Sequence, residues 1–125
     1  MGQAIAVPNI QNRAMDYALR AITLFRFLEK KRDGVAEILG RQYLRSSTSV
    51  GANLVEAQSG ESRRDFIHKC SLAQKEARES RYWLTLMLKS ELVPATRLTK
   101  LMDETNQLIA ILTAIIVKTK RGANA

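Results

Sequence analysis

The feature that most limits the fold is a row of apolar and small residues that recurs at alternating spacings of four and three. Between residues 61 and 91 this row consists of Phe66, Cys70, Ala73, Ala77, Ser80, Leu84 and Met87. These spacings place every member on one face of a helix, and a row of this length is typical of a helix that packs against other helices. The segment is therefore predicted to be a long helix in a bundle.

Two further segments, residues 12–31 and 95–118, have the same period. Their stripes are Ala14, Tyr17 or Ala18, Ala21, Leu24 or Phe25, and Leu28 in the first, and Leu98, Leu101, Thr105, Leu108, Leu112 and Ile115 in the second. Gly34 predicts the end of the first helix, and Pro94 ends the helix over 61–91 and suits the first turn of the last one. Both segments are therefore predicted to be helices with one buried face.

Residues 37–58 are harder to assign because residues 45–53 are poor helix formers. Propensity alone favours a loop there. The small and apolar residues nevertheless keep helical spacing, at Leu44, Ser47 or Thr48, Gly51, Leu54 or Val55, and Gln58. We predict a helix whose small residues allow a neighbouring helix to approach closely.

These patterns predict one all-α domain over residues 1–125, an antiparallel up-down four-helix bundle. The expected helices are 12–31, 37–58, 61–91 and 95–118, with flexible ends at 1–10 and 122–125. A single cysteine and the lack of a recognisable signal peptide favour a cytoplasmic protein. The longest apolar run, residues 108–117, is about half of the roughly 20 residues that cross a bilayer, so no membrane association is expected.

No residue pattern indicates an enzyme, a cofactor or a metal site. His68 and Cys70 are the only histidine and cysteine, and they lie on opposite helix faces, so they cannot form a metal site or a nucleophile pair. Cys70 fits a small core residue. The carboxylates are explained by surface ion pairs, with Glu79 paired to Lys75 four residues before it and Asp65 paired to Lys69 four residues after it.

The net charge of +8 favours anionic partners such as RNA or DNA. The alternative is a basic surface that serves only solubility, since no segment is purely basic. The candidate nucleic-acid contacts fall in three groups. They are Arg64, His68, Lys75, Arg78 and Tyr82 along the helix over 61–91, Arg41 and Arg45 on the preceding helix, and Lys118, Lys120 and Arg121 near the C-terminus. A row of cations that ends in an aromatic ring suits phosphates and a stacked base.

Residues 108–117 are apolar on almost every side, which requires cover on more than one side. Two explanations remain open. The surplus flank, Ile109, Ile111 and Ile116, forms a subunit interface, or it widens the core stripe of a single chain.

Three stretches resemble the bacterial four helix bundle protein family, whose founding members are encoded by intervening sequences in ribosomal RNA genes. They are Arg45–Gln58, Ser62–Lys69 and residues 75–84 with their Tyr82-Trp83-Leu84 sequence. The resemblance covers about residues 15–118. It implies a homopentameric ring, and Trp83 is interpreted as a packing or interface residue. A more distant branch of the family is the accessory protein of diversity-generating retroelements, which binds a reverse transcriptase and its template RNA.

Two functions from different classes follow. The first is a non-catalytic, basic, oligomeric accessory protein that binds nucleic acid, in particular structured RNA. The second is a protein–protein interaction scaffold whose basicity is incidental. A gene carried by a ribosomal RNA insertion without a selected activity is a third explanation.

Overall fold

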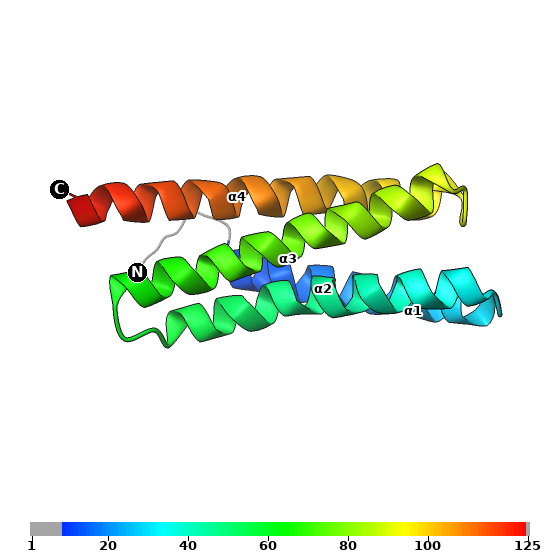
Figure 1. Ribbon diagram of the computed structural model, residues 1–125, viewed down its shortest axis with the longest axis horizontal. Helices are drawn as coiled ribbons and strands as arrows, with labels where there is room; N and C mark the ends of the chain where they lie inside the picture. The colour runs from blue at the N-terminus through cyan, green and yellow to red at the C-terminus, as the bar shows by residue number, and fades with distance from the viewer. Residues whose placement is uncertain (1–8, 125) are drawn as a thin grey trace.

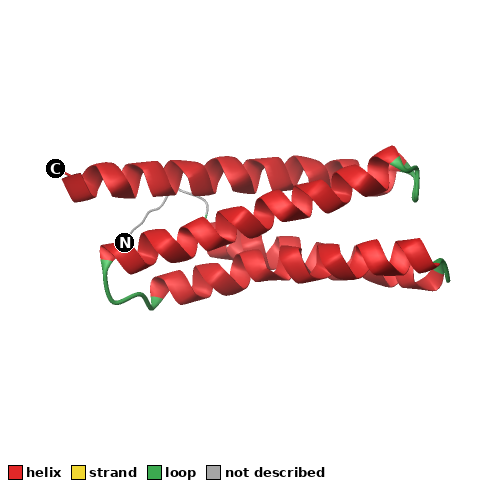
Figure 2. Cartoon of the chain, viewed as in Figure 1, coloured by secondary structure: helices red, strands yellow, loops and turns green. Residues whose placement is uncertain are grey.

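The computed structural model describes residues 9–124, and this part of the chain is built from helices and contains no strand (Figures 1 and 2). The four long helices are α1 (Ile10–Lys30), α2 (Gly34–Gln58), α3 (Arg63–Lys89) and α4 (Thr99–Asn124), and a short 3₁₀ helix, η1 (Ala95–Arg97), precedes α4. Successive helices run in opposite directions and pack on one another, and α4 also contacts α1. The predicted all-α four-helix bundle is confirmed.

The turn between α1 and α2 differs from the prediction. Asp33 precedes α2, and its carboxylate accepts hydrogen bonds from the backbone N–H groups of Val35 and Ala36 at 2.9 and 3.2 Å. Gly34 is therefore the first residue of α2 and does not end α1. The residue with positive φ is Arg32, at 52°. An aspartate at this position satisfies free N–H groups and complements the positive end of the helix dipole, and this outweighs the usual preference for glycine after a helix.

The other helix ends also refine the expected boundaries. Ser62 caps α3 by accepting a hydrogen bond from the backbone N–H of Asp65 at 3.0 Å. Pro94 lies before η1 and is not in the first turn of α4. Helix α4 continues to Asn124, past the predicted end at 118, and the helical residue Ile10 lies in the end predicted to be flexible. Asn9, in the same predicted end, caps α1, and residues 122–124 of the other predicted flexible end belong to α4. Residues 1–8 and residue 125 lie outside the described part.

The serine-rich middle of α2 is helical, as its spacing predicted. The hydroxyls of Thr48 and Ser49 donate to the backbone carbonyls of Leu44 and Arg45, both at 2.7 Å, so they need no partner outside the helix. A Cβ atom added at Gly51 would lie 3.5 Å from the Cβ of Ala14 on α1. Small side chains therefore allow α2 to pack closely against its neighbours.

The core consists of two clusters of buried side chains. One lies toward the end with the α1–α2 turn, and the other, rich in alanine, lies toward the opposite end. Ile109 and Ile116 belong to the second cluster and are 8% and 7% exposed, so the predicted exposed flank on α4 is wrong for these two residues. The structure matches the alternative of a wide core stripe, because α4 packs against both α3 and α1 and needs apolar side chains toward each. Ile111 is half-buried.

A layer of buried polar groups crosses the middle of the bundle. Thr105 donates to the carbonyl of Leu101 at 2.6 Å, so Tyr17 donates its hydroxyl hydrogen to Thr105 Oγ1 at 2.5 Å. The rings of Tyr17 and Tyr43 meet edge to face, 6.2 Å between centroids. Burial raises the pKa of both tyrosines. The hydroxyl of Tyr43, however, has no hydrogen-bond partner among the described residues.

Replacing Tyr43 with phenylalanine is expected to raise the free energy of unfolding by about 1 kcal/mol, because it removes a buried hydroxyl that makes no hydrogen bond. The matched change Tyr17→Phe removes a bonded hydroxyl and should lower the free energy of unfolding by about 1 kcal/mol. Urea denaturation of both variants measures the difference. A loss of stability in Tyr43→Phe equal to that in Tyr17→Phe would show that the Tyr43 hydroxyl is hydrogen-bonded in solution.

Candidate nucleic-acid interface

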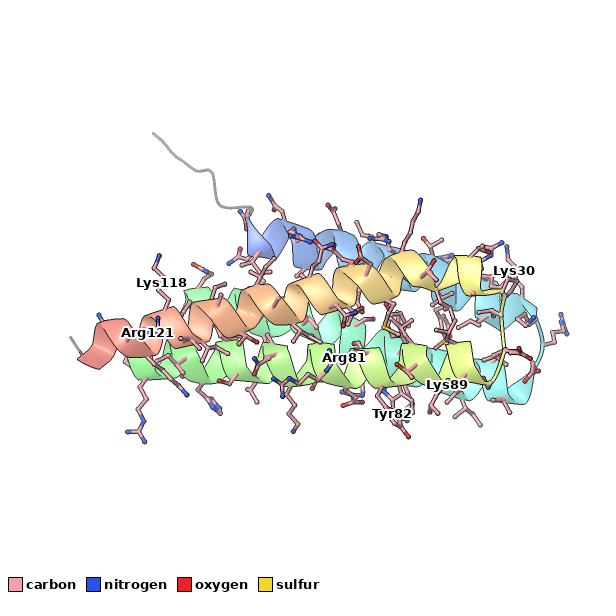
Figure 3. The ribbon with its side chains drawn as sticks, turned by 90° about the horizontal axis from the view of Figure 1, so that it is seen from above. Lys30, Arg81, Tyr82, Lys89, Lys118 and Arg121 are labelled. Carbon is pink, nitrogen blue, oxygen red and sulfur yellow. The ribbon has the colours of Figure 1, made fainter. Side chains whose placement is uncertain are left out.

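Helix α3 carries its core residues on one side and its predicted nucleic-acid contacts on the other. The core side consists of the buried residues Cys70, Ala73, Ala77, Ser80, Leu84 and Met87. A helix has 3.6 residues per turn, so a second row at heptad spacing lies opposite this one. That row is Arg64, His68, Lys75, Arg78 and Tyr82, all exposed, and we call it the α3 outer face. Tyr82 projects away from the bundle (Figure 3).

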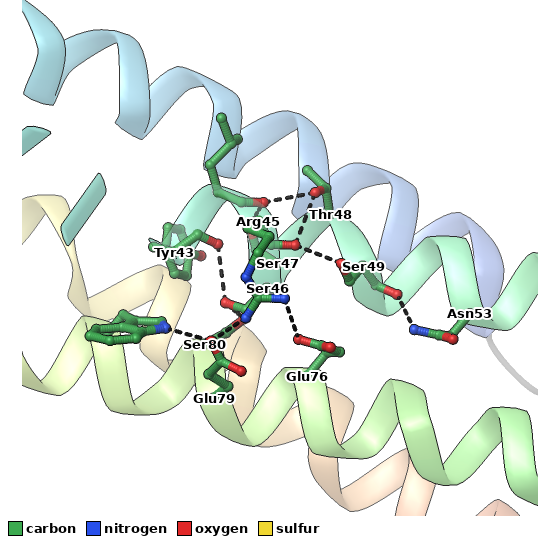
Figure 4. Close-up of polar contacts among 12 residues, drawn as sticks. Tyr43, Arg45, Ser46, Ser47, Thr48, Ser49, Asn53, Glu76, Glu79 and Ser80 are labelled. Atoms are coloured by element: carbon green, nitrogen blue, oxygen red, sulfur yellow. Dashed lines mark hydrogen bonds and ion pairs between the residues drawn. The ribbon is translucent and has the colours of Figure 1, made fainter. Parts of the chain in front are cut away.

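The acidic residues in the middle of α3 point elsewhere, toward α2. Arg45 donates from Nη1 to Glu76 Oε1 at 3.3 Å and from Nη2 to Glu79 Oε2 (Figure 4). The indole N–H of Trp83 also donates to Glu79, at 3.0 Å. The hydrogen bond from Arg45 holds the pKa of Glu79 below its ordinary value. Glu76 and Glu79 therefore contribute to the contact between α2 and α3 and form no ion pair with the cations of the outer face.

This network corrects two predictions. The ion-pair partner of Glu79 is Arg45, 34 residues away in the sequence, and not Lys75. No ion pair joins Asp65 to Lys69 among the described residues. Arg45 is held by two carboxylates of its own chain, so its charge is compensated and it differs from the free cations of the outer face.

The remaining predicted contacts are spread over other surfaces. Arg41 is paired with Glu37 one turn away at 2.8 Å, and both side chains are exposed. Lys118, Lys120 and Arg121 are exposed on the last turns of α4, and Lys118 lies on the side of α4 near α1 (Figure 3). The structure thus brings together the five residues of the α3 outer face and leaves the other candidates apart from them.

Two cations beside the outer face were not predicted. Lys89 is exposed seven residues after Tyr82, and therefore continues the same row. Arg81 is exposed toward α4, where its guanidinium donates to Asn106 Oδ1 at 3.1 Å. Continuing the heptad by one repeat would have found Lys89. Arg81 could not be found in this way, because its position depends on the packing of α4 against α3.

Comparison with known proteins assigns the chain to a family. A family model described as 23S rRNA-intervening sequence protein matches residues 8–114. The chain belongs to this family. The match includes all of α3, so the outer face lies within the matched residues, whereas Lys118, Lys120 and Arg121 lie beyond them. The resemblance found in the sequence is thereby confirmed.

A solved structure supports the same assignment to the 23S rRNA-intervening sequence protein family. It is a protein of unknown function from the S23 ribosomal protein family of Bacteroides thetaiotaomicron, 34% identical to this chain, with a TM-score of 0.79. The similarity covers 86% of this chain and 98% of the other. The comparison with curated proteins gave no match.

The predicted interface residue Trp83 is half-buried at the edge of the outer face. Its ring meets that of Tyr82 edge to face, 5.1 Å between centroids, and its N–H is bonded to Glu79. Tyr82 is 57% exposed, so one aromatic surface remains accessible to solvent. The Trp83 ring therefore contacts the Tyr82 ring and leaves part of it exposed to solvent.

Outside the α3 outer face, we looked for a reactive thiol, a metal site and a membrane-spanning helix among the described residues. Cys70 is buried in the core, and burial raises the pKa of its thiol. Across residues 9–124 no group of three His, Cys, Asp or Glu side chains is arranged to hold a metal ion. None of the described helices is both long and apolar enough to span a membrane. Phosphate binding by exposed cations is the chemistry for which the arrangement of α3 is best suited.

Proposed function

We propose that this protein binds structured RNA, without catalysis, through the α3 outer face. One observation carries the proposal, the separation of charge on α3. Arg64, Lys75 and Arg78 are exposed and form no ion pair within residues 9–124, whereas Glu76 and Glu79 are turned toward Arg45. Exposed cations that form no ion pair attract phosphates and release the counterions bound to them.

The shape of the surface favours RNA with exposed bases. Arg64 and Arg78 are 14 positions apart, which corresponds to about 21 Å along a helix. Tyr82 follows one turn later and offers an exposed ring on which a base can stack. Side chains recognise RNA mainly at loops, bulges and single strands, where bases are unstacked. Membership in a family described by ribosomal RNA intervening sequences agrees with such a ligand.

The test is a titration of the purified protein with labelled stem-loop RNA at about 50 and 200 mM salt, the range over which phosphate contacts differ strongly. Binding should be tight at the lower salt concentration and weaken steeply at the higher one. Absence of binding at low salt would overturn the proposal. Binding with the same affinity at both salt concentrations would exclude phosphate contacts as its basis.

A second candidate function, assembly with other protein chains, is favoured by exposed apolar residues. The large apolar side chains that are most exposed occur on all four helices: Met15, Leu19, Val35, Ile38, Val55, Tyr82 and Val117. We infer a homo-oligomer, and the family resemblance suggests a pentameric ring. In a ring, one patch of each chain contacts a different patch of the next copy, so exposed apolar residues on several helices suit such an assembly.

Sedimentation equilibrium is expected to give a mass several times that of one chain. Leu19→Glu, which places a charge on the exposed side of α1, should shift the mass toward the monomer and leave the helical circular dichroism unchanged. A monomeric wild-type protein would contradict the assembly.

A further inference from the structure

A small pocket lies where the second half of α1 meets η1 and the first turn of α4, away from the α3 outer face. It is open to solvent and has a volume of about 240 Å³. Its polar wall carries Arg20, Arg97 and Lys100, and its floor includes the buried side chains of Leu24 and Leu101. None of the described residues that line it is acidic. We call it the Arg97 pocket. Three exposed cations that line one hollow create a positive potential that favours an anion.

The guanidinium group of Arg97 is held in place by its surroundings. Its central carbon lies 3.8 Å from the centroid of the Phe27 ring, and Phe27 packs against the core. A guanidinium stacked on an aromatic face keeps the N–H groups along its edge available for an acceptor. Thr96 adds a hydroxyl group to the same wall, whereas the hydroxyl of Thr23 donates to the backbone carbonyl of Leu19 at 3.2 Å. The pocket therefore combines an ordered charged donor with one neutral donor, Thr96.

The start of α4 adds further positive potential. Its first turn contains no acidic residue, and the preceding residue, Leu98, has no side-chain oxygen with which to cap the helix. The first N–H groups of a helix and its dipole favour an anion nearby. Lys100 belongs to this first turn and also lines the pocket.

Two carboxylates lie in a hollow that adjoins the pocket. Asp103 and Glu104 line an adjoining hollow together with Arg20 and Lys100. Glu104 accepts two hydrogen bonds from Arg13, at 2.7 and 3.1 Å, and Asp103 accepts one from the side chain of Gln107 at 2.9 Å. Glu104 is thus ion-paired with Arg13, and neither carboxylate forms an ion pair with the cations of the Arg97 pocket among the described residues.

We propose that the Arg97 pocket binds a phosphate group. Its volume is below the range of about 300–1,000 Å³ that is usual for whole small-molecule ligands, and it suits one tetrahedral anion. A phosphate monoester carries a charge of about −1.5 to −2 at neutral pH and three acceptor oxygens, which match three cations and the Thr96 hydroxyl. Two sources share this chemistry, a free phosphate or nucleotide and the phosphorylated end of an RNA strand.

Calorimetric titration with inorganic phosphate, at ionic strength held constant with sodium chloride, tests the site. Wild-type protein should bind one phosphate per chain saturably. Lys100→Gln and Arg97→Gln should each weaken binding about tenfold or more, as expected when a charge-assisted hydrogen bond is lost. Lys69→Gln removes the same charge near the start of α3, outside the pocket, and should have no effect. Absence of saturable binding, or equal affinity in Lys100→Gln and wild type, would overturn the proposal.

The source of the phosphate is resolved with adenosine monophosphate and with one RNA strand bearing either a 5′-phosphate or a 5′-hydroxyl. Tighter binding of the phosphorylated strand, lost in Lys100→Gln, identifies an RNA end. Equal binding of both strands, with displacement of phosphate by the nucleotide, identifies a free nucleotide, and no displacement identifies inorganic phosphate. Since phosphate is titrated without RNA, failure of the proposed RNA binding by α3 leaves this test intact.

Discussion

Changing Arg64, Lys75 and Arg78 together to glutamate is expected to lower the affinity for structured RNA by about 10³-fold at 0.1 M salt. The logarithm of the binding constant falls with the logarithm of the salt concentration by about 0.7–0.9 per phosphate contact. When the salt concentration falls from 1 M to 0.1 M, each contact therefore raises the logarithm of the binding constant by about 0.7–0.9. Losing three contacts therefore lowers the affinity at 0.1 M salt by about 10²–10³-fold, and the introduced negative charges add repulsion.

The control must alter the net charge equally at another place. Arg26, Lys30 and Arg32 are exposed cations on α1 and in the following turn, and their replacement by glutamate changes the charge by the same amount. This control variant should lose much less affinity, since only long-range attraction is reduced. Circular dichroism checks that both variants remain helical. Equal losses in the two variants would show that the overall charge, and not the α3 outer face, binds RNA.

A gentler set of variants counts the contacts. Changing Arg64, Lys75 or Arg78 singly to glutamine should reduce the slope of log affinity against log salt by about one each, while weakening binding to different RNA sequences alike. Tyr82→Ala should act differently, because stacking on a base contributes affinity with little dependence on salt.

The helical parts of this fold are readable from the sequence because each depends on local spacing. The row from Phe66 to Met87 determines which side of α3 is buried, and the same spacing determines its exposed side. The turn after α1 is less readable, since Asp33 and Gly34 are both plausible helix-boundary residues, and the hydrogen bonds made by Asp33 decide between them. Local rules therefore identify the helices better than they identify the turns.

The candidate site also has one part that local spacing predicts and another that depends on how the helices pack. The α3 outer face lies on a single helix, so periodicity was sufficient to find it. Arg45 has the same charge as its members, and its pairing with Glu76 and Glu79 depends on how α2 packs against α3. The Arg97 pocket joins residues 80 positions apart, Arg20 and Lys100, from helices that no sequence pattern connects. Contacts between helices decide which cations are free.

Packing also decides between the two explanations of the apolar surplus on α4. A residue at a subunit interface would be exposed in the isolated chain, whereas Ile109 is 8% exposed and lies among Ala73, Ala77 and Val50 in the second core cluster. Alanine side chains on long helices cannot extend to fill a space left by a neighbour. A truncation at Ile109 should therefore leave a cavity.

Replacing Ile109 with alanine is expected to lower the free energy of unfolding by about 2–4 kcal/mol, from the lost burial of apolar surface and the unfilled cavity. Val117→Ala, on the same helix but 41% exposed, should change it by no more than about 0.5 kcal/mol. Urea denaturation at one fixed protein concentration measures both, because the stability of an oligomer depends on concentration. If Ile109→Ala leaves the stability unchanged but lowers the sedimentation mass, Ile109 lies at a subunit interface. That result would contradict its place in the core.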